Sequence, residues 1–216
     1  MTKTYDFKEQ LAKSHMAEDM PFWKEIYKKA FPDMVTMISH RQDGEHQRAG
    51  IDRSIILHNS KQILIDEKVR YRSEKTGMVY EDIILEYWSN EEQRSPGWVI
   101  KPLRADYIAY AIEPLGICYL LPVIQLQQAW KKWGERWKAK YPKPIKARTR
   151  TSNGHYTTVS VAVEVKELFK AIGACLRIEF NPYEKQTAVE AVEDEMMAGI
   201  PDGIPDGTPH ESAWAE

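Results

Sequence analysis

The strongest constraint on the fold is a short polar connection, 58–61, between two runs rich in β-branched residues, 47–57 and 62–71. Such runs are typical of β-strands, and a connection this short requires the two strands to pair antiparallel. If the loop holds three residues, counting back along both strands places Asp52 opposite Asp66. The sequence therefore predicts a β-hairpin in which each strand carries a carboxylate.

The rest of the chain carries alternating helix and strand signals. Apolar spacing, together with Pro, Gly and acidic start or stop residues, predicts helices over 6–13, 18–31, 103–112, 122–137 and 164–172. Short alternating or wholly apolar runs predict further strands over 80–88, 117–121, 156–163 and 175–180. The segment 141–154 is basic and contains prolines, so we expect a loop there. This order predicts an α/β domain with a mixed sheet.

Charge is distributed unevenly along the chain. The 216 residues carry a net charge of −2, but 188–216 hold eight acidic residues and no Lys or Arg, which leaves +6 on the first 187 residues. Two Ile-Pro-Asp-Gly repeats in the acidic segment oppose helix and strand formation. We therefore expect a single domain over 1–187, followed by an acidic, flexible tail over 188–216.

Several classes of protein are disfavoured by the composition. The longest apolar stretch, 107–124, is interrupted by Glu113 and Pro114, and the N-terminus lacks the apolar core of a signal peptide, so we expect a cytoplasmic protein without a membrane span. Cys118 and Cys175 lie in apolar runs and are expected to be buried thiols. The six histidines lack the spacing of a zinc site, and the sequence shows no Gly-rich phosphate loop, no dinucleotide-binding pattern and no hydrolase serine elbow.

The second strand of the hairpin places an acid and a lysine on one face. Asp66 and Lys68 are two residues apart, and side chains alternate along a strand. Directly opposed residues have Cβ atoms about 4.5–5.5 Å apart, so Asp52 and Asp66 would repel each other without a cation. Oxygen ligands of this kind select Mg²⁺ or Mn²⁺. Lys68 would then lie beside a water that attacks phosphorus.

This arrangement resembles the PD-(D/E)XK nuclease superfamily, in which an acid on one strand is followed on the next by an acid, any residue and a lysine. Here the pattern is Ile51-Asp52 and then Asp66-Glu67-Lys68, with isoleucine where the family usually has proline. The resemblance implies that Asp52 and Asp66 are metal ligands and that the backbone carbonyl of Glu67 is a further ligand. It also implies that Lys68 lies next to the attacking water.

The resemblance further implies a restriction-endonuclease-like fold, whose core is ordered α-β-β-β-α-β. It covers about 18–121 and leaves about 122–187 as a C-terminal α/β extension. An acid on the first helix often belongs to such sites. Glu25, at the edge of the apolar face of its helix, is the candidate, and Glu18 is the second choice.

A purely structural interpretation stays open for each of these acids. Asp52 and Asp66 would then be exposed strand residues that pair across the sheet with Arg53, Lys68 or Arg70. Glu25 would be a solvated carboxylate beside the lysines of its own helix.

A second informative feature is the segment 131–150, which contains nine Lys or Arg and one acid. Positive charge of this density suits a phosphate backbone. We expect nucleic-acid contacts from Lys138, Lys140, Lys143, Lys146, Arg148 and Arg150. Trp133 and Trp137 could stack on unpaired bases. Their helical spacing with Leu126 and Trp130 instead favours a position in the core or an interface.

Together these features predict a Mg²⁺- or Mn²⁺-dependent nuclease that acts on DNA as an endonuclease or exonuclease, with RNA as the open alternative. A compact nuclease without a helicase or recognition domain would suit a phage or mobile element, and a homodimer would suit paired cuts. The alternative function is a nucleic-acid-binding or protein-inhibiting module on the same fold that does not cleave.

Overall fold

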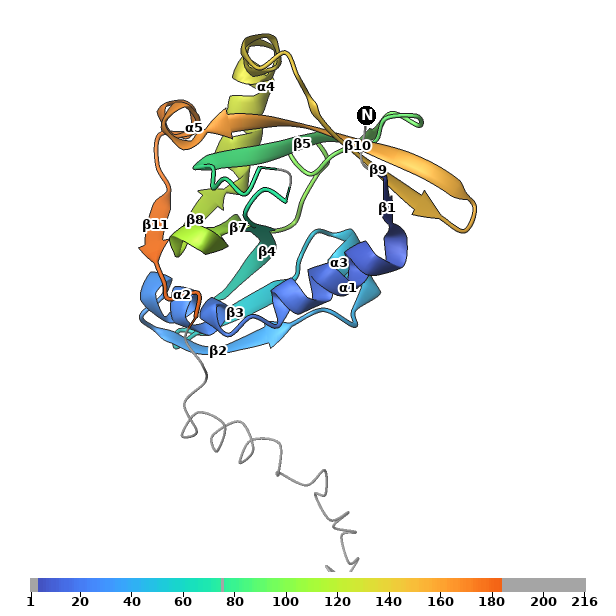
Figure 1. Ribbon diagram of the computed structural model, residues 1–216. Helices are drawn as coiled ribbons and strands as arrows, with labels where there is room; N and C mark the ends of the chain where they lie inside the picture. The colour runs from blue at the N-terminus through green and yellow to red at the C-terminus, as the bar shows by residue number, and fades with distance from the viewer. Residues whose placement is uncertain (1–3, 75, 184–216) are drawn as a thin grey trace, which may run out of the picture. The chain divides into compact units, whose positions relative to one another are not determined.

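The computed structural model describes residues 4–74 and 76–183, which form two β-sheets with helices packed against them (Figure 1). The fold is mixed α/β, as expected from the sequence. The predicted acidic tail, 188–216, lies outside the described residues. No helix in the described part of the chain is both long enough and apolar enough to cross a membrane.

The larger sheet has six strands in the order β11-β8-β7-β4-β3-β2. Their bounds are Met34–Ser39 (β2), Arg53–Leu57 (β3), Gln62–Arg70 (β4), Tyr107–Ile112 (β7), Ile117–Pro122 (β8) and Leu176–Glu179 (β11). Neighbouring strands pair antiparallel except β4 and β7, which run parallel. A parallel pair requires a crossover connection, and here the chain between β4 and β7 passes through the second sheet.

The smaller sheet has five strands in the order β1-β9-β10-β5-β6. Their bounds are Thr4–Asp6 (β1), Asp82–Asn90 (β5), Ser95–Pro96 (β6), Ile145–Thr151 (β9) and Gly154–Glu164 (β10). β1 runs parallel to β9, and the other neighbours pair antiparallel. This sheet is therefore also mixed.

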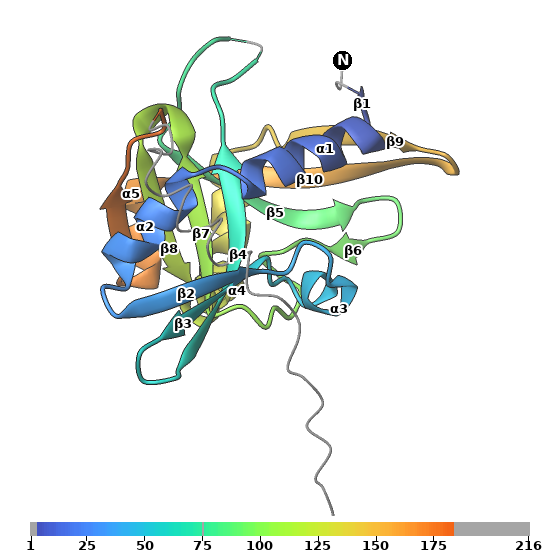
Figure 2. The same ribbon diagram turned by 90° about the horizontal axis from the view of Figure 1, so that it is seen from below.

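The described residues form five α-helices, with bounds Phe7–Glu18 (α1), Phe22–Ala30 (α2), Gly44–Arg48 (α3), Val123–Lys140 (α4) and Val165–Ile172 (α5). Asp6 caps α1, because its Oδ1 accepts the backbone N–H of Lys8 at 2.9 Å. α4 starts directly after Pro122, and α5 is followed by Gly173, whose φ of 80° favours glycine. Figure 2 shows α1 lying along the β9–β10 hairpin, which extends beyond the rest of its sheet.

Two hydrophobic cores lie on opposite faces of the six-stranded sheet. One contains the apolar side chains of α2, and the other contains those of α4 and α5 together with β5 and β10. β7 contributes to both cores by alternation: Ala109 and Ala111 face α2, while Ile108 and Tyr110 face the other core. The centre of the sheet is therefore covered on both sides.

Most predicted elements are present near their expected positions. The predicted helices over 18–31, 122–137 and 164–172 correspond to α2, α4 and α5, and the predicted strands correspond to β3, β4, β5, β8, β10 and β11. The strand expected over 47–57 begins only at Arg53, because 44–48 forms α3. β2 has no counterpart among the predictions. Both cysteines are free, Cys118 buried and Cys175 partly buried.

The helix predicted over 103–112 is wrong, because this segment contains the central strand β7. Its alanines suggested a helix, but Tyr107, Ile108, Tyr110 and Ile112 favour a strand. Ala109 and Ala111 are fully buried in the core that includes α2. Small side chains at these positions let the helix approach the sheet closely, and this packing role explains the alanines.

The loop predicted over 141–154 is also wrong over most of its length. Residues Ile145–Thr151 form β9, which pairs with β1 on one side and β10 on the other. Lys146, Arg148 and Arg150 form the exposed, cationic face of β9, while Thr149 on the other face is 5% exposed. A strand whose buried side chains are small and polar lacks the apolar alternation by which strands are recognised in a sequence.

Candidate active site

The β3–β4 hairpin holds the two acids expected from the sequence close together. Arg53 lies opposite Ile65, which is the register that a three-residue loop requires. Asp52 directly precedes β3, and its backbone N–H donates to the carbonyl of Ile65 at 2.8 Å. Its carboxylate accepts the backbone N–H of Glu67 at 2.8 Å. Asp52 is thereby fixed against β4 next to Asp66.

Asp66 and Lys68 project from the same face of β4 and form an ion pair. Asp66 is 4% exposed. Lys68 Nζ also donates to the backbone carbonyl of Glu67 at 3.2 Å. We call Asp52, Asp66, Lys68 and the Glu67 carbonyl the carboxylate–lysine cluster. Asp66 is therefore not an exposed strand residue, although it pairs with Lys68 as the structural alternative also expects.

Burial and charge shift the pKa values of this cluster in opposing ways. Burial raises the pKa of Asp66 to about 7, with Lys68 acting to lower it and the charge of Asp52 acting to raise it. Burial acts to lower the pKa of Lys68, but the carboxylates of Asp66 and Asp52 outweigh that effect and raise it. Without a metal, Lys68 is therefore protonated at neutral pH.

The cluster has the donor set of a site for a hard divalent cation. Two carboxylates and a backbone carbonyl supply oxygen ligands, and one lysine cannot neutralise both acids. Asp52, Asp66 and the Glu67 carbonyl are the groups that could hold Mg²⁺ or Mn²⁺. Lys68 is the group that could contact a reacting phosphate or water.

β5 brings a further carboxylate, Glu86, which the sequence analysis missed. Burial raises the pKa of Glu86, while the ammonium groups of Lys68 and Lys101 act to lower it. β4 and β5 also meet through an ion pair between Arg70 and Asp82 at 3.1 Å. An acid flanked on both sides by apolar residues, Ile83 to Leu85 and Tyr87 to Trp88, is the sequence signal that could have identified Glu86.

The side chain of Glu67 lies on the opposite face of β4 from the cluster. Its Oε1 accepts hydrogen bonds from the Tyr27 hydroxyl and from Arg53 Nε, both at 2.6 Å. Arg53 also donates to the carbonyl of Glu18 at 2.8 Å. Burial raises the pKa of Glu67, and the charge of Arg53 opposes this. The Glu67 side chain therefore ties β4 to α2 and to the end of α1, and only its carbonyl faces the cluster.

The structure does not bring Glu25 to the cluster. Its carboxylate pairs with Lys29 at 2.5 Å and accepts the backbone N–H of Asn181 at 3.1 Å. Glu18, the second choice, ends α1 and interacts with Asp52: burial raises the pKa of Glu18, and the charge of Asp52 raises it further. Glu18 Oε2 is buried and has no hydrogen-bond partner within the described residues. Glu18 is therefore the helical acid that the fold associates with the cluster.

Four of the basic residues expected to bind nucleic acid pair with acidic residues, and three of these acids are distant in the sequence. The ion pairs are Lys138 with Glu135, Lys140 with Glu167, Lys146 with Glu91, and Arg150 with Asp6. Arg148 instead contacts His155 at 2.6 Å, and Lys143 has no ion pair among the described residues. Exposed ion pairs of this kind are weak because water and salt screen them, so phosphate groups could replace the carboxylates.

The cations of β9 lie on the opposite face of the five-stranded sheet from the cluster. Lys146 is opposite Val159 on β10, and the next residue, Ser160, is opposite Glu86 on β5. Because neighbouring side chains alternate, Lys146 and Glu86 project from opposite faces. The charge of Lys146 accordingly acts to lower the pKa of Tyr87, whose ring stacks on that of Trp130 in α4. A nucleic acid would have to pass around the edge of the five-stranded sheet to contact both the β9 cations and the carboxylate–lysine cluster.

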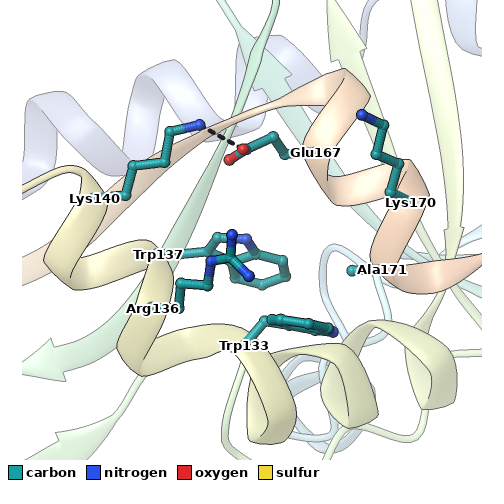
Figure 3. A pocket seen from close by; sticks show the side chains of 7 residues that line it. All are labelled: Trp133, Arg136, Trp137, Lys140, Glu167, Lys170 and Ala171. Atoms are coloured by element: carbon teal, nitrogen blue, oxygen red, sulfur yellow. Dashed lines mark hydrogen bonds and ion pairs between the residues drawn. The ribbon is translucent and has the colours of Figure 1, made fainter.

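A pocket of about 190 Å³ lies between α4 and α5 (Figure 3). The Arg136 guanidinium lies 5.4 Å from the centre of the Trp133 ring, and Lys140 pairs with Glu167 above it. Trp137 is only 4% exposed and belongs to the hydrophobic core, as its helical spacing indicated. The residues that line the pocket come from α4 and α5, and none of them belongs to the carboxylate–lysine cluster.

Comparison with known proteins identifies no relative: no protein-family model, no curated protein and no solved structure matches this chain. The function is therefore inferred from the residues of the site.

Proposed function

We propose that this protein is a Mg²⁺- or Mn²⁺-dependent nuclease that hydrolyses phosphodiester bonds, with DNA as its substrate. The observation that carries the proposal is that Asp52, Asp66, Lys68 and the Glu67 carbonyl lie next to one another on the β3–β4 hairpin, linked by the contacts of Asp52 and Lys68 with β4. Each of these groups stands where the PD-(D/E)XK pattern has a functional group.

The order of the strands supports the proposal in part. After α2 the chain forms three consecutive antiparallel strands, β2, β3 and β4, and β7 then runs parallel to β4. This follows the α-β-β-β part of the restriction-endonuclease-like order. The connection from β4 to β7 departs from it, because β5 and β6 stand in place of the second helix. Asp52 and Asp66 accordingly belong to the second and third strands after α2.

The residues of the cluster divide the chemistry between them. Asp52, Asp66 and the Glu67 carbonyl would hold the divalent cation, which when bound stabilises the negative charge that builds up on the phosphate. Asp52 is kept in place by the N–H of Glu67. Lys68 Nζ can donate hydrogen bonds to a phosphate oxygen while protonated, or accept a proton from the attacking water after losing its own.

A cleavage assay tests this function. Wild-type protein with Mg²⁺ or Mn²⁺ should cut single- or double-stranded DNA, and EDTA should stop the reaction. Asp66→Asn and Lys68→Ala should each lower kcat by at least a hundredfold while leaving most of the affinity for DNA intact, because both groups act mainly in the transition state. Asp82→Asn is the matched control, since it breaks a neighbouring ion pair between β4 and β5 outside the cluster.

Two results would overturn the assignment. The first is full cleavage by folded Lys68→Ala protein. The second is tight nucleic-acid binding by the wild type without cleavage of DNA or RNA in any divalent metal, which would favour a binding module instead.

A further inference from the structure

A second group of metal-ligating side chains lies outside the carboxylate–lysine cluster, in the segment that precedes β3. His40, Asp43 and His46 each offer a ligand atom, and these atoms lie within 4.8 Å of one another. Among the residues that the structure describes, no other group of three or more His, Cys, Asp or Glu side chains has its ligand atoms this close together. The sequence spacing did not indicate it, because the side chains converge only when α3 folds back on β3.

Each of the three side chains is held by a specific partner. Asp43 Oδ1 accepts the backbone N–H groups of Glu45 and His46 at 3.0 and 3.1 Å, and its Oδ2 bonds to His46 Nδ1 at 2.7 Å. His40 Nε2 bonds to the hydroxyl of the fully buried Ser54 at 2.7 Å. One nitrogen of each ring is thus anchored, and the other, His40 Nδ1 or His46 Nε2, has no hydrogen-bond partner among the described residues.

This pattern is typical of metal-binding histidines. A ligating imidazole usually directs its second nitrogen to a carboxylate, carbonyl or other fixed polar group, which sets the orientation of the ring. Ser54 provides such a group for His40 and leaves His40 Nδ1 available as a ligand. Asp43 Oδ2 already lies 2.7 Å from His46 Nδ1, so an ion that takes both of these atoms as ligands replaces the hydrogen bond between them.

A modest rearrangement would complete a coordination sphere. The two imidazole rings are stacked, with centroids 4.0 Å apart and planes 3° from parallel. Metal–nitrogen bonds of about 2.0–2.1 Å in a tetrahedral site place ligand atoms about 3.3 Å apart. The rings therefore have to turn out of the stack and close by roughly 1.5 Å at most. The side chains of His46 and Asp43 are 36% and 44% exposed, so they have room to move.

We propose that His40, Asp43 and His46 form a binding site for a borderline divalent cation of the Zn²⁺ type, with one coordination position open to water. Imidazole ligands favour Zn²⁺, Co²⁺, Ni²⁺ or Cu²⁺, whereas the oxygen ligands of the carboxylate–lysine cluster favour Mg²⁺ or Mn²⁺. The two sites therefore select different ions.

The ion would also fasten the backbone that carries Asp52. The backbone N–H of His40 donates to the carbonyl of Asp52 at 2.9 Å, and Ser54, the anchor of His40, lies two residues further along the chain. Binding of the ion would tie the segment 40–48 to the start of β3. The proposal itself does not depend on nuclease activity.

The test uses the full chain without an affinity tag, in the Asp66→Asn background, so that the carboxylate–lysine cluster does not contribute. Zn²⁺ binding is measured by calorimetry, and Co²⁺ binding by the visible absorption of a tetrahedral Co²⁺ centre. We expect one equivalent of ion per chain. Adding His46→Ala should weaken binding at least tenfold, whereas adding His15→Ala on α1 should leave it unchanged. His46 is chosen because its exposed ring can be truncated without disturbing the buried Ser54.

Two outcomes would overturn the proposal: folded Asp66→Asn protein that binds neither ion, or binding that persists unchanged in the Asp66→Asn/His46→Ala protein. A lack of Zn²⁺ binding together with Mg²⁺-dependent cleavage by the wild type would refute this site and leave the proposed nuclease standing. Zn²⁺ binding without any cleavage would support this site and refute the proposed nuclease.

Discussion

At the residue scale, Glu67 connects the hydrophobic core to the candidate site. Its N–H and carbonyl contact Asp52 and Lys68, while its side chain is held on the other face by Tyr27 and Arg53. A buried carboxylate is tolerated only when its partners satisfy it. The network on the α2 side therefore fixes the course of the backbone that presents Asp66 and Lys68.

Substitutions in this network should lower the free energy of unfolding in a defined order. Tyr27→Phe removes one hydrogen bond to a buried charge and should cost about 1.5–3 kcal/mol. Arg53→Met leaves the Glu67 carboxylate without its counter-ion and should cost about 3–5 kcal/mol. Urea denaturation measures both values. Tyr71→Phe is the control, because Tyr71 is 46% exposed and should change stability little. Equal stability of the Tyr27→Phe and Tyr71→Phe proteins would contradict the network.

At the element scale, the hairpin was predictable from the sequence, whereas β7 and the placement of two acids were not. A short turn and period-two alternation are local properties, so the register that brings Asp52 to Asp66 follows from counting residues. β7 was mistaken for a helix because its alanines reflect packing against α2, which the local sequence does not contain. Glu86 on β5 and Glu18 on α1 interact electrostatically with Lys68 and Asp52, and such long-range placement also leaves no local pattern.

The position of β9 leads to a prediction about nucleic-acid binding. Neutralising Lys146, Arg148 and Arg150 together removes up to three phosphate contacts, and each contact contributes about 0.9 to the slope of log affinity against log salt. Binding to long duplex DNA should weaken, and the slope should fall by up to about 2.7. Cleavage of a short oligonucleotide should not change, because it cannot span from the cluster to the opposite face. A slope equal to that of the wild type would show that β9 does not face the nucleic acid.

At the scale of the whole molecule, buried acids gather where the two sheets and α1 meet. Burial raises the pKa of Glu18, Asp66, Asp82 and Glu86 there, and that of Glu67 on the other face of β4. Each of these carboxylates costs free energy when it ionises inside the fold, and basic partners offset this cost only in part. The protein should therefore be more stable when these carboxylates are protonated, or when a metal cation takes the place of the proton on Asp66.

The pH dependence of stability tests this in metal-free protein. The pKa of Asp66 is about 7 in the folded chain and about 3.8 when unperturbed, so the folded state holds a proton that the unfolded state has lost. The free energy of unfolding should fall as pH rises from about 4 through about 7. Lys68 does not affect this window, because its raised pKa acts only above pH 10. His40, whose pKa burial lowers below its usual value, acts in the opposite direction.

Comparison with Asp66→Asn isolates the contribution of the cluster, because His40 is present in both proteins. Urea denaturation in EDTA at pH 5 and pH 8 should show a larger loss of stability in the wild type than in the variant. Mg²⁺ or Mn²⁺ at a hundred times its dissociation constant should then restore about 2.7 kcal/mol at pH 8 in the wild type and none in Asp66→Asn. The same ions should stabilise much less at pH 5, because a proton on Asp66 competes with the metal for the carboxylate. Identical pH profiles for the two proteins would mean that Asp66 is not protonated in the folded chain. Asp66 would then be ionised at both pH values, and Mg²⁺ or Mn²⁺ should stabilise the protein equally at pH 5 and pH 8.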